Sequence, residues 1–159
     1  MPTNITIHNA RTDDAADVAA MVGELLGEIM DAIGERAFNF DLAATTARLA
    51  DFLSREKYVV FVARGADGEA AGFVSLYESC ALYAEGVFGT IPEFYVRPAF
   101  RSAGVGRRLA ERVKAFGRSR GWTRLEVTTP PLPQFERTLR FYEREGFTVT
   151  GGRKLKTAL

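Results

Sequence analysis

The sequence predicts a mixed α/β (α+β) fold with about four helices and roughly six to seven strands. Apolar residues recur at steps of three and four along residues 12–33 and again along 104–120, which is typical of helices with one buried face. Residues 58–63 (YVVFVA) form an unbroken apolar run rich in β-branched and aromatic side chains, as in a strand covered on both faces. The turn at 65–68 (GADG) joins this run to a second one at 71–77, so these two strands should form a hairpin.

Length and composition limit the class of protein. With 159 residues, 47% hydrophobic and 26% charged, the chain is expected to form one globular domain over residues 1–159. No apolar run approaches the roughly 18 residues of a membrane helix, and the first residues lack a signal-peptide core, so we expect a cytoplasmic protein with no membrane partner. The single cysteine excludes an internal disulfide. One cysteine and one histidine also argue against a metal site or a Cys–His catalytic pair.

The N-terminal third is predicted to contain one strand and two helices. Residues 4–10 alternate isoleucines with polar neighbours, which indicates a half-buried strand. A helix should begin after the capping residues at 12–14. Asp41 is the predicted N-cap of a second helix that reaches about residue 54.

An acidic row lies on the first of these helices, and we define it as Glu24, Glu28, Asp31 and Glu35. Two interpretations are open. The row can be an ordinary solvated helix face, which is the commoner meaning of a run of charges. It can also be an acidic wall that attracts a cationic amine.

Residues 80–89 are the least regular stretch, and they are interpreted either as a loop or as a strand extension that lines a pocket. Cys80 lies in this stretch. It is interpreted as a packed, small apolar residue and not as an acyl carrier, because no base is identifiable beside it.

Residues 91–108 (IPEFYVRPAFRSAGVGRR) are predicted to run from a strand through a glycine-containing loop into a helix. Pro92 cannot donate to a sheet ladder, so the strand at 91–96 should be interrupted by a bulge near its start. Gly104 and Gly106 serve either a tight turn or the close approach of backbone N–H groups to an anion at a helix N-terminus. Residues 97–124 contain nine basic residues and one acid in a chain of net charge +1, which favours a ligand with several phosphates.

The C-terminal part is predicted to add three further elements. They are a short strand at 124–128, a helix from about residue 134 to 144, and a last hairpin formed by 147–150 and 153–157 around a Gly-Gly turn.

The segment Arg101-Ser-Ala-Gly104-Val-Gly106 fits the motif R/Q-x-x-G-x-G/A, and on it the chain resembles the GNAT superfamily of acyl-CoA-dependent N-acyltransferases. Residues 95–98 (YVRP) and 141–147 (FYEREGF) are similar to flanking segments of that family, in the same order and spacing. The resemblance implies a GNAT-like fold: a central, twisted, mostly antiparallel sheet that is flanked by the helices and splayed at the cofactor site. It also implies acetyl-CoA as the co-substrate.

The same resemblance implies where the cofactor binds. Main-chain groups of Phe94, Tyr95 and Val96 would hold the pantetheine arm, and an N–H of this strand would face the thioester oxygen. Amides of the following loop would bind the pyrophosphate. The predicted cofactor-binding residues of the loop and of the later segment are Arg101, Ser102, Ala103, Gly104, Val105, Gly106, Arg107 and Phe141. Two positions depart from the family, since Ser102 stands where glycine is common and Phe135 where many members carry asparagine.

Two side chains are predicted to be catalytic. Tyr142 matches the family's tyrosine that protonates the departing thiolate, although a tyrosine on an apolar helix face is usually a core residue. Glu93 is the candidate general base, acting directly or through a water molecule, and the alternative is an exposed or paired strand carboxylate. No Ser-His-Asp or Cys-His nucleophile is identifiable, which favours direct attack by the amine in a ternary complex.

The predicted protein is therefore an acetyl-CoA-dependent N-acetyltransferase that acts on a primary amine of a small molecule or peptide. The prediction allows either a monomer or a homodimer. The alternative is a non-catalytic coenzyme A-binding sensor of the same fold. A dinucleotide site is weaker, because GVGRRL lacks the third glycine of GxGxxG and no βαβ repeat precedes it. Nucleic-acid binding is disfavoured, because the net charge is near zero and the aromatic residues are not interleaved with the basic ones.

Overall fold

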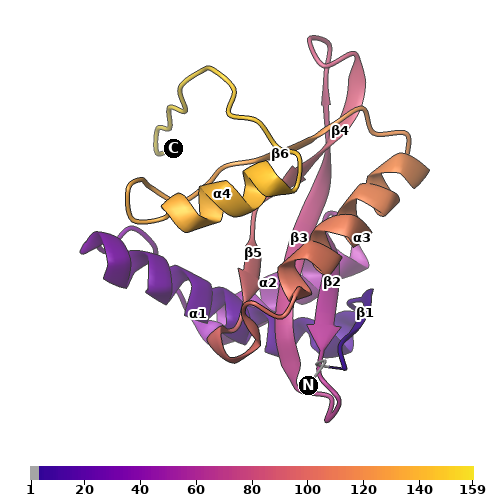
Figure 1. Cartoon of the computed structure of the whole chain (residues 1–159), viewed down its shortest axis with the longest axis vertical. Coiled ribbons are helices and arrows are strands. Elements are labelled where there is room, and N and C mark those ends of the chain that lie inside the picture. Colours follow the sequence, from indigo (N-terminus) through magenta and orange to yellow (C-terminus); the bar gives the residue numbers. More distant parts are fainter. Residues whose placement is uncertain (1–3) are drawn as a thin grey trace. The chain divides into compact units, whose positions relative to one another are not determined.

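A computed structural model describes residues 4–159, which divide into two compact units. The first unit extends to Thr128 and contains the sheet and the first three α-helices, and the second unit, Thr129–Leu159, contains the last α-helix (Figure 1). The six-stranded sheet and four α-helices of the described residues confirm the predicted mixed α/β class. None of the helices in the described residues has the length and apolarity needed to cross a membrane.

The N-terminal elements of the first unit follow the predicted order. They are β1 (Thr6–Asn9), the short 3₁₀ helix η1 (Thr12–Asp14), α1 (Ala15–Ile33) and α2 (Leu42–Ser54). Helix α1 ends where Gly34 takes a left-handed conformation with φ of 70°. The Asp41 carboxylate accepts a hydrogen bond of 2.8 Å from the Ala44 N–H, so the predicted N-cap of α2 is confirmed.

The sheet is mostly antiparallel, as predicted. The strands after β1 are β2 (Val59–Arg64), β3 (Ala70–Ala81), β4 (Gly86–Ile91), β5 (Phe94–Val96) and β6 (Leu125–Val127). The strands run in the order β1-β2-β3-β4-β6, and β5 pairs with β3 outside this path. The pair β4–β6 is parallel, whereas the other pairs are antiparallel.

The stretch at residues 80–89 is a strand extension and not a loop. It contains the end of β3 and the start of β4, which pair from Tyr77 with Thr90 to Ala81 with Gly86. Cys80 lies on this extension and is exposed to solvent, so its interpretation as a packed residue was wrong. The extension reaches beyond the part of β3 that is buried, and the side chain therefore has no core to enter.

Helices cover both faces of the sheet, because successive strand residues point to opposite sides. Helices α1 and α2 pack on one face, where Val62 and Phe73 share a buried cluster with Met21 of α1. Helix α3 (Val105–Ser119) packs on the other face, where its Phe116 ring lies 5.7 Å from the ring of Phe61. In Figure 1, α3 stands in front of the sheet and α2 behind it.

The second unit contains α4 (Glu136–Arg144), which ends before Gly146 with a φ of 97°. The hairpin predicted at 147–150 and 153–157 is wrong, because no strand is found there. Its apolar residues find no covering layer: Val149 is 72% exposed and Leu155 is 88% exposed. A two-stranded hairpin without a buried face is marginal in water, which accounts for the difference.

Candidate functional site

The sheet is interrupted between β4 and β5, at Pro92 and Glu93. Ser75 of β3 bridges the gap, since its N–H donates to the Glu93 carbonyl at 2.9 Å and its Oγ accepts from the Glu93 N–H at 3.0 Å. The predicted interruption is thereby confirmed, but it divides residues 91–96 into two strands instead of leaving one bulged strand. Proline lacks an N–H, so regular pairing cannot continue through this position.

The interruption leaves β5 at the edge of the sheet. Strand β6 pairs with β4 as far as Ile91, and among the described residues β5 pairs with β3 alone. The N–H of Arg97 donates to Ala71 and that of Ser75 to Glu93, so alternation directs the N–H and C=O of Phe94 and Val96 away from β3. Among the described residues β4 and β5 therefore do not pair with each other, at the place where the sequence resemblance implies a splayed sheet.

Gly72 of β3 permits the close approach of β5. A Cβ atom at this position would lie 2.6 Å from the Tyr95 carbonyl oxygen, a distance that real Cβ contacts do not show. Any side chain at residue 72 would therefore displace the strand on which the cofactor contacts are predicted.

The loop that leads into α3 has the backbone shape of an anion cradle. Ser102 and Gly104 both adopt left-handed conformations, with φ of 62° and 80°. Within residues 4–159, no backbone hydrogen bond is found for the amides of residues 102–107. These N–H groups stand at a helix N-terminus, where they can donate to a diphosphate, so the residues present fit the pyrophosphate of coenzyme A.

Two arginines connect this loop region to α1. Arg97 donates to both carboxylate oxygens of Glu24, through Nε at 3.1 Å and Nη2 at 2.8 Å. Arg101 donates through Nη2 to Glu28 at 2.8 Å and through Nε to the Val96 carbonyl at 2.9 Å. The side chain of Arg101 is thus directed at α1 and β5. In this conformation only the main chain of Arg101 can contact a phosphate.

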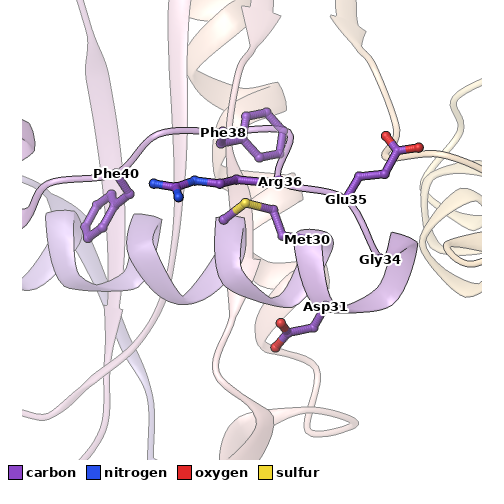
Figure 2. Close-up of a pocket in the computed structure, with 7 residues that line it drawn as sticks. All are labelled: Met30, Asp31, Gly34, Glu35, Arg36, Phe38 and Phe40. Atoms are coloured by element: carbon purple, nitrogen blue, oxygen red, sulfur yellow. The ribbon is translucent and has the colours of Figure 1, made fainter.

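The same contacts divide the acidic row on α1. Glu24 and Glu28 are neutralised by arginines, so in this structure they form an ion-paired face and not an open acidic wall. Asp31 and Glu35 form no ion pair within residues 4–159 and line an open groove of about 600 Å³. Figure 2 shows Met30, Arg36, Phe38 and Phe40 on one side of α1, whereas the Asp31 carboxylate points to the other side.

Glu93 has the surroundings of a candidate base. Its Oε1 accepts from the Ser75 hydroxyl at 2.6 Å, and its Oε2 accepts from the Tyr58 hydroxyl at 3.4 Å. Burial raises the pKa of Glu93, and the hydrogen bonds from Ser75 and Tyr58 lower it in part. Glu93 directly precedes β5, and no basic side chain pairs with its carboxylate within the described part of the first unit.

The other predicted catalytic residue belongs to the second unit. Tyr142 lies on α4, is 6% exposed, and packs between the rings of Phe141 and Phe147 with centroids 5.4 and 5.5 Å away. Burial raises the pKa of Tyr142, so its phenol keeps the proton across the physiological range. The predicted site residues are thus divided, with Phe141 and Tyr142 in the second unit and the remainder in the first.

Sequence reasoning did not identify Ser75 and Tyr58 as partners of Glu93. A signal for Ser75 was present, because it is the one polar residue within the buried run at residues 71–76 and such a residue needs a hydrogen-bond partner. Tyr58 gave no comparable signal. A group of three or more potential metal-ligating side chains is not found among the described residues.

Comparison with known proteins supports the family assignment. The Acetyltransferase (GNAT) domain family matches residues 56–149, which is more than half of the chain. Streptothricin acetyltransferase from Streptomyces lavendulae is 37% identical over 95 residues, covering 57% of this chain. The match spans about half the length of that relative, 45% of it.

Solved structures share the fold at low sequence identity. An aminoglycoside N-acetyltransferase in complex with CoA has a TM-score of 0.79 at 17% identity, with 99% of this chain and 97% of that chain covered. A ribosomal-protein-alanine N-acetyltransferase from Brucella melitensis has a TM-score of 0.75 at 19% identity, with 98% and 100% covered. These likenesses confirm the predicted fold. The domain match confirms the predicted acyltransferase class, and the chain belongs to the GNAT acetyltransferase family.

Proposed function

We propose that this protein transfers an acetyl group from acetyl-CoA to a primary amine by direct attack within a ternary complex. The observation that carries the proposal is the break at Pro92 and Glu93. It places a half-buried carboxylate directly before β5, in the same unit as the loop whose amides have no backbone acceptor among the described residues.

Coenzyme A would be held by main-chain groups of two segments. The N–H groups of Phe94 and Val96 point away from β3 and can donate to the carbonyl groups of a pantetheine arm, whereas the Val96 carbonyl already accepts from Arg101 Nε. The amides of residues 102–107 would bind the pyrophosphate. Bound acetyl-CoA supplies the acetyl group as an activated thioester.

The chain would supply the proton transfers. An amine is protonated at neutral pH and must lose a proton before it can attack, and Glu93 is the proposed acceptor of that proton. Its raised pKa makes it a stronger base than an ordinary glutamate. Tyr142 is proposed to donate a proton to the departing thiolate, and its buried phenol is protonated at working pH. The proposed acetyltransferase domain is the whole of residues 1–159. The family match from residue 56 to 149 crosses the boundary between the units, which supports parts of both units belonging to one such domain.

The acceptor is proposed to be a small cationic amine. The relative named for streptothricin acetylation supports this class, and the half-buried Glu93, with neutral partners in the first unit, would favour a cation. A peptide amine is the competing acceptor, and the experiment below includes one.

The test is free-thiol release from acetyl-CoA with a panel of amines: streptothricin, an aminoglycoside, glucosamine 6-phosphate and an alanine-initiated peptide. We expect thiol release that depends on the amine, together with an acetylated product in the mass spectrum. Binding of coenzyme A by calorimetry without thiol release for any amine would instead establish the sensor of the same fold. Failure to bind coenzyme A would contradict both functions.

A further inference from the structure

The carboxylate of Glu93 is held by two hydroxyl groups that approach different oxygens. Ser75 donates to Oε1 at 2.6 Å, and Tyr58 donates to Oε2 at 3.4 Å. The shorter bond from Ser75 is also part of the backbone bridge at the strand break, because the same Oγ accepts from the Glu93 N–H. The hydrogen bond from Tyr58 is not part of this bridge, so it can be removed without disrupting the backbone pairing of Ser75 with Glu93.

The Tyr58 ring is fixed by its neighbours. Tyr58 immediately precedes β2, and the register of Val59 with Leu76 places it opposite Tyr77 of β3. The two tyrosine rings are stacked with centroids 6.2 Å apart and an interplanar angle of 13°. The ring of Phe52 from α2 lies 5.2 Å from the Tyr58 ring. Aromatic contacts of this kind restrict the ring, so the hydroxyl is presented to Glu93 in one place.

The following inference rests on the proposed acetyl transfer. We infer that Tyr58 is a positioning residue, whose O–H keeps the Glu93 carboxylate ionised and oriented to receive the proton of an incoming ammonium group. The proton passes from the acceptor nitrogen to a carboxylate oxygen of Glu93 and then to water, and the nitrogen keeps the electron pair with which it attacks the thioester carbonyl. When the carbon–sulfur bond breaks, the electron pair leaves with the thiolate, which takes up a proton.

The charged and titratable groups around Glu93 support a specific pH effect. Within the described part of the first unit, the hydroxyls of Ser75 on β3 and Tyr58 before β2 donate to Glu93, and Tyr77 on β3 is stacked beside Tyr58. Burial is the main cause that raises the pKa of Tyr58, with the nearby Glu93 carboxylate second. The phenol therefore stays protonated and remains a donor wherever Glu93 is ionised. A donor to the ionised form lowers the pKa of an acid, so its removal should raise the pKa of Glu93.

The experiment compares Tyr58→Phe with Tyr77→Phe, a matched control that removes a hydroxyl from the same stacked pair without touching Glu93. The acid limb of the kcat/KM profile for the amine should move to higher pH by about 0.5–1 unit in Tyr58→Phe. The KM for acetyl-CoA should not change. The Tyr77→Phe profile should coincide with that of the unmodified protein. Coincident profiles for Tyr58→Phe and the unmodified protein would overturn the inference.

A second measurement does not depend on activity. In protein labelled with ¹³C at the glutamate carboxyl carbons, the Glu93 signal is assigned by its absence in Glu93→Gln, and its titration midpoint should rise in Tyr58→Phe only. If Tyr58→Phe does not fold, 3-fluorotyrosine placed at Tyr58 makes a more acidic donor, and the Glu93 midpoint should then fall. An unmoved midpoint overturns the inference even if the enzyme is active. A moved midpoint in a protein that acetylates no amine would retain the Tyr58–Glu93 interaction and reject the proposed function.

Discussion

Glu24 and Glu93 lie in the same unit, and their surroundings are opposite. Glu24, on α1, receives two hydrogen bonds from the Arg97 guanidinium and is 38% exposed. Glu93, between β4 and β5, receives hydrogen bonds from two neutral hydroxyls and is half-buried. The charge of Glu24 is already matched within the protein, whereas that of Glu93 is not matched within the first unit.

The difference indicates two kinds of duty for a carboxylate. An ion-paired carboxylate holds two elements together, here α1 and the segment after β5. A half-buried carboxylate without a cationic partner is costly for folding, and such groups are concentrated at functional sites. Substitutions of the two residues should therefore fail in different ways: one in catalysis, the other in stability.

The largest expected effect is on Glu93. Glu93→Gln keeps the shape of the side chain and removes its ability to take a proton, so kcat should fall by about 10² or more. Binding of coenzyme A, measured by calorimetry, should be retained because the main-chain contacts of β5 and the loop are unchanged. Full activity of Glu93→Gln at every pH would remove Glu93 from the chemistry and with it the contrast to Glu24.

Tyr142→Phe extends the contrast to a buried acid in the second unit. Loss of the phenol should lower kcat by about 10² while leaving coenzyme A affinity nearly unchanged, because only the protonation of the thiolate is affected. Steady-state kinetics together with calorimetry separate the two quantities. An unchanged kcat would assign Tyr142 to the aromatic packing with Phe141 and Phe147 alone.

A smaller effect is expected at Glu24. Glu24→Gln should lower the free energy of unfolding by about 1 kcal/mol, since it removes a two-bond ion pair that is partly exposed. Glu35→Gln is the matched control on the same helix, because Glu35 forms no ion pair among residues 4–159. Denaturant unfolding of both variants measures the difference, and equal stabilities would show that the Arg97 pair does not hold α1 to the sheet.

The smallest effect concerns the pH dependence of stability. The folded-state pKa of Glu93 is raised, so the folded protein disfavours the ionised form and becomes less stable as the pH rises from the unfolded pKa, about 4.3, through the folded value. The Glu93→Gln variant has no titrating carboxyl group at this position, so it does not lose stability in this way as the pH rises. Its Tm relative to the unmodified protein should therefore increase between pH 4 and pH 8. A constant difference in Tm would show that Glu93 is not withdrawn from water in solution.

Much of the fold could be predicted, because its elements depend on local patterns. The apolar period of α1, the Asp41 cap and the hairpin of β2 and β3 were all apparent in the chain and are present. The interruption at Pro92 followed from a missing N–H. The prediction of a last hairpin was wrong, because a pattern of turns and alternating residues does not show whether another layer will cover the strands.

The candidate site could be predicted only in part. The loop from Arg101 to Arg107 was located by its glycines, yet the left-handed Ser102 was not foreseen as such. The directions of the Arg97 and Arg101 side chains depend on where α1 packs. Each arginine pairs with a glutamate of α1 that lies 73 positions earlier in the chain. Patterns of neighbouring residues carry no information on such pairs.

The sequence alone determined the family, the order of nearly all elements and the loop suited to a diphosphate, because glycine, proline and apolar spacing act within a few residues. The tertiary structure alone decided the state of each carboxylate. Pairing of β3 with the interrupted strand brought Ser75 to Glu93, the register of β2 with β3 stacked Tyr58 on Tyr77, and packing of α1 gave Glu24 and Glu28 their arginines. The ionisation of a carboxylate depends on the groups within a few ångströms of it, and chain folding sets those distances.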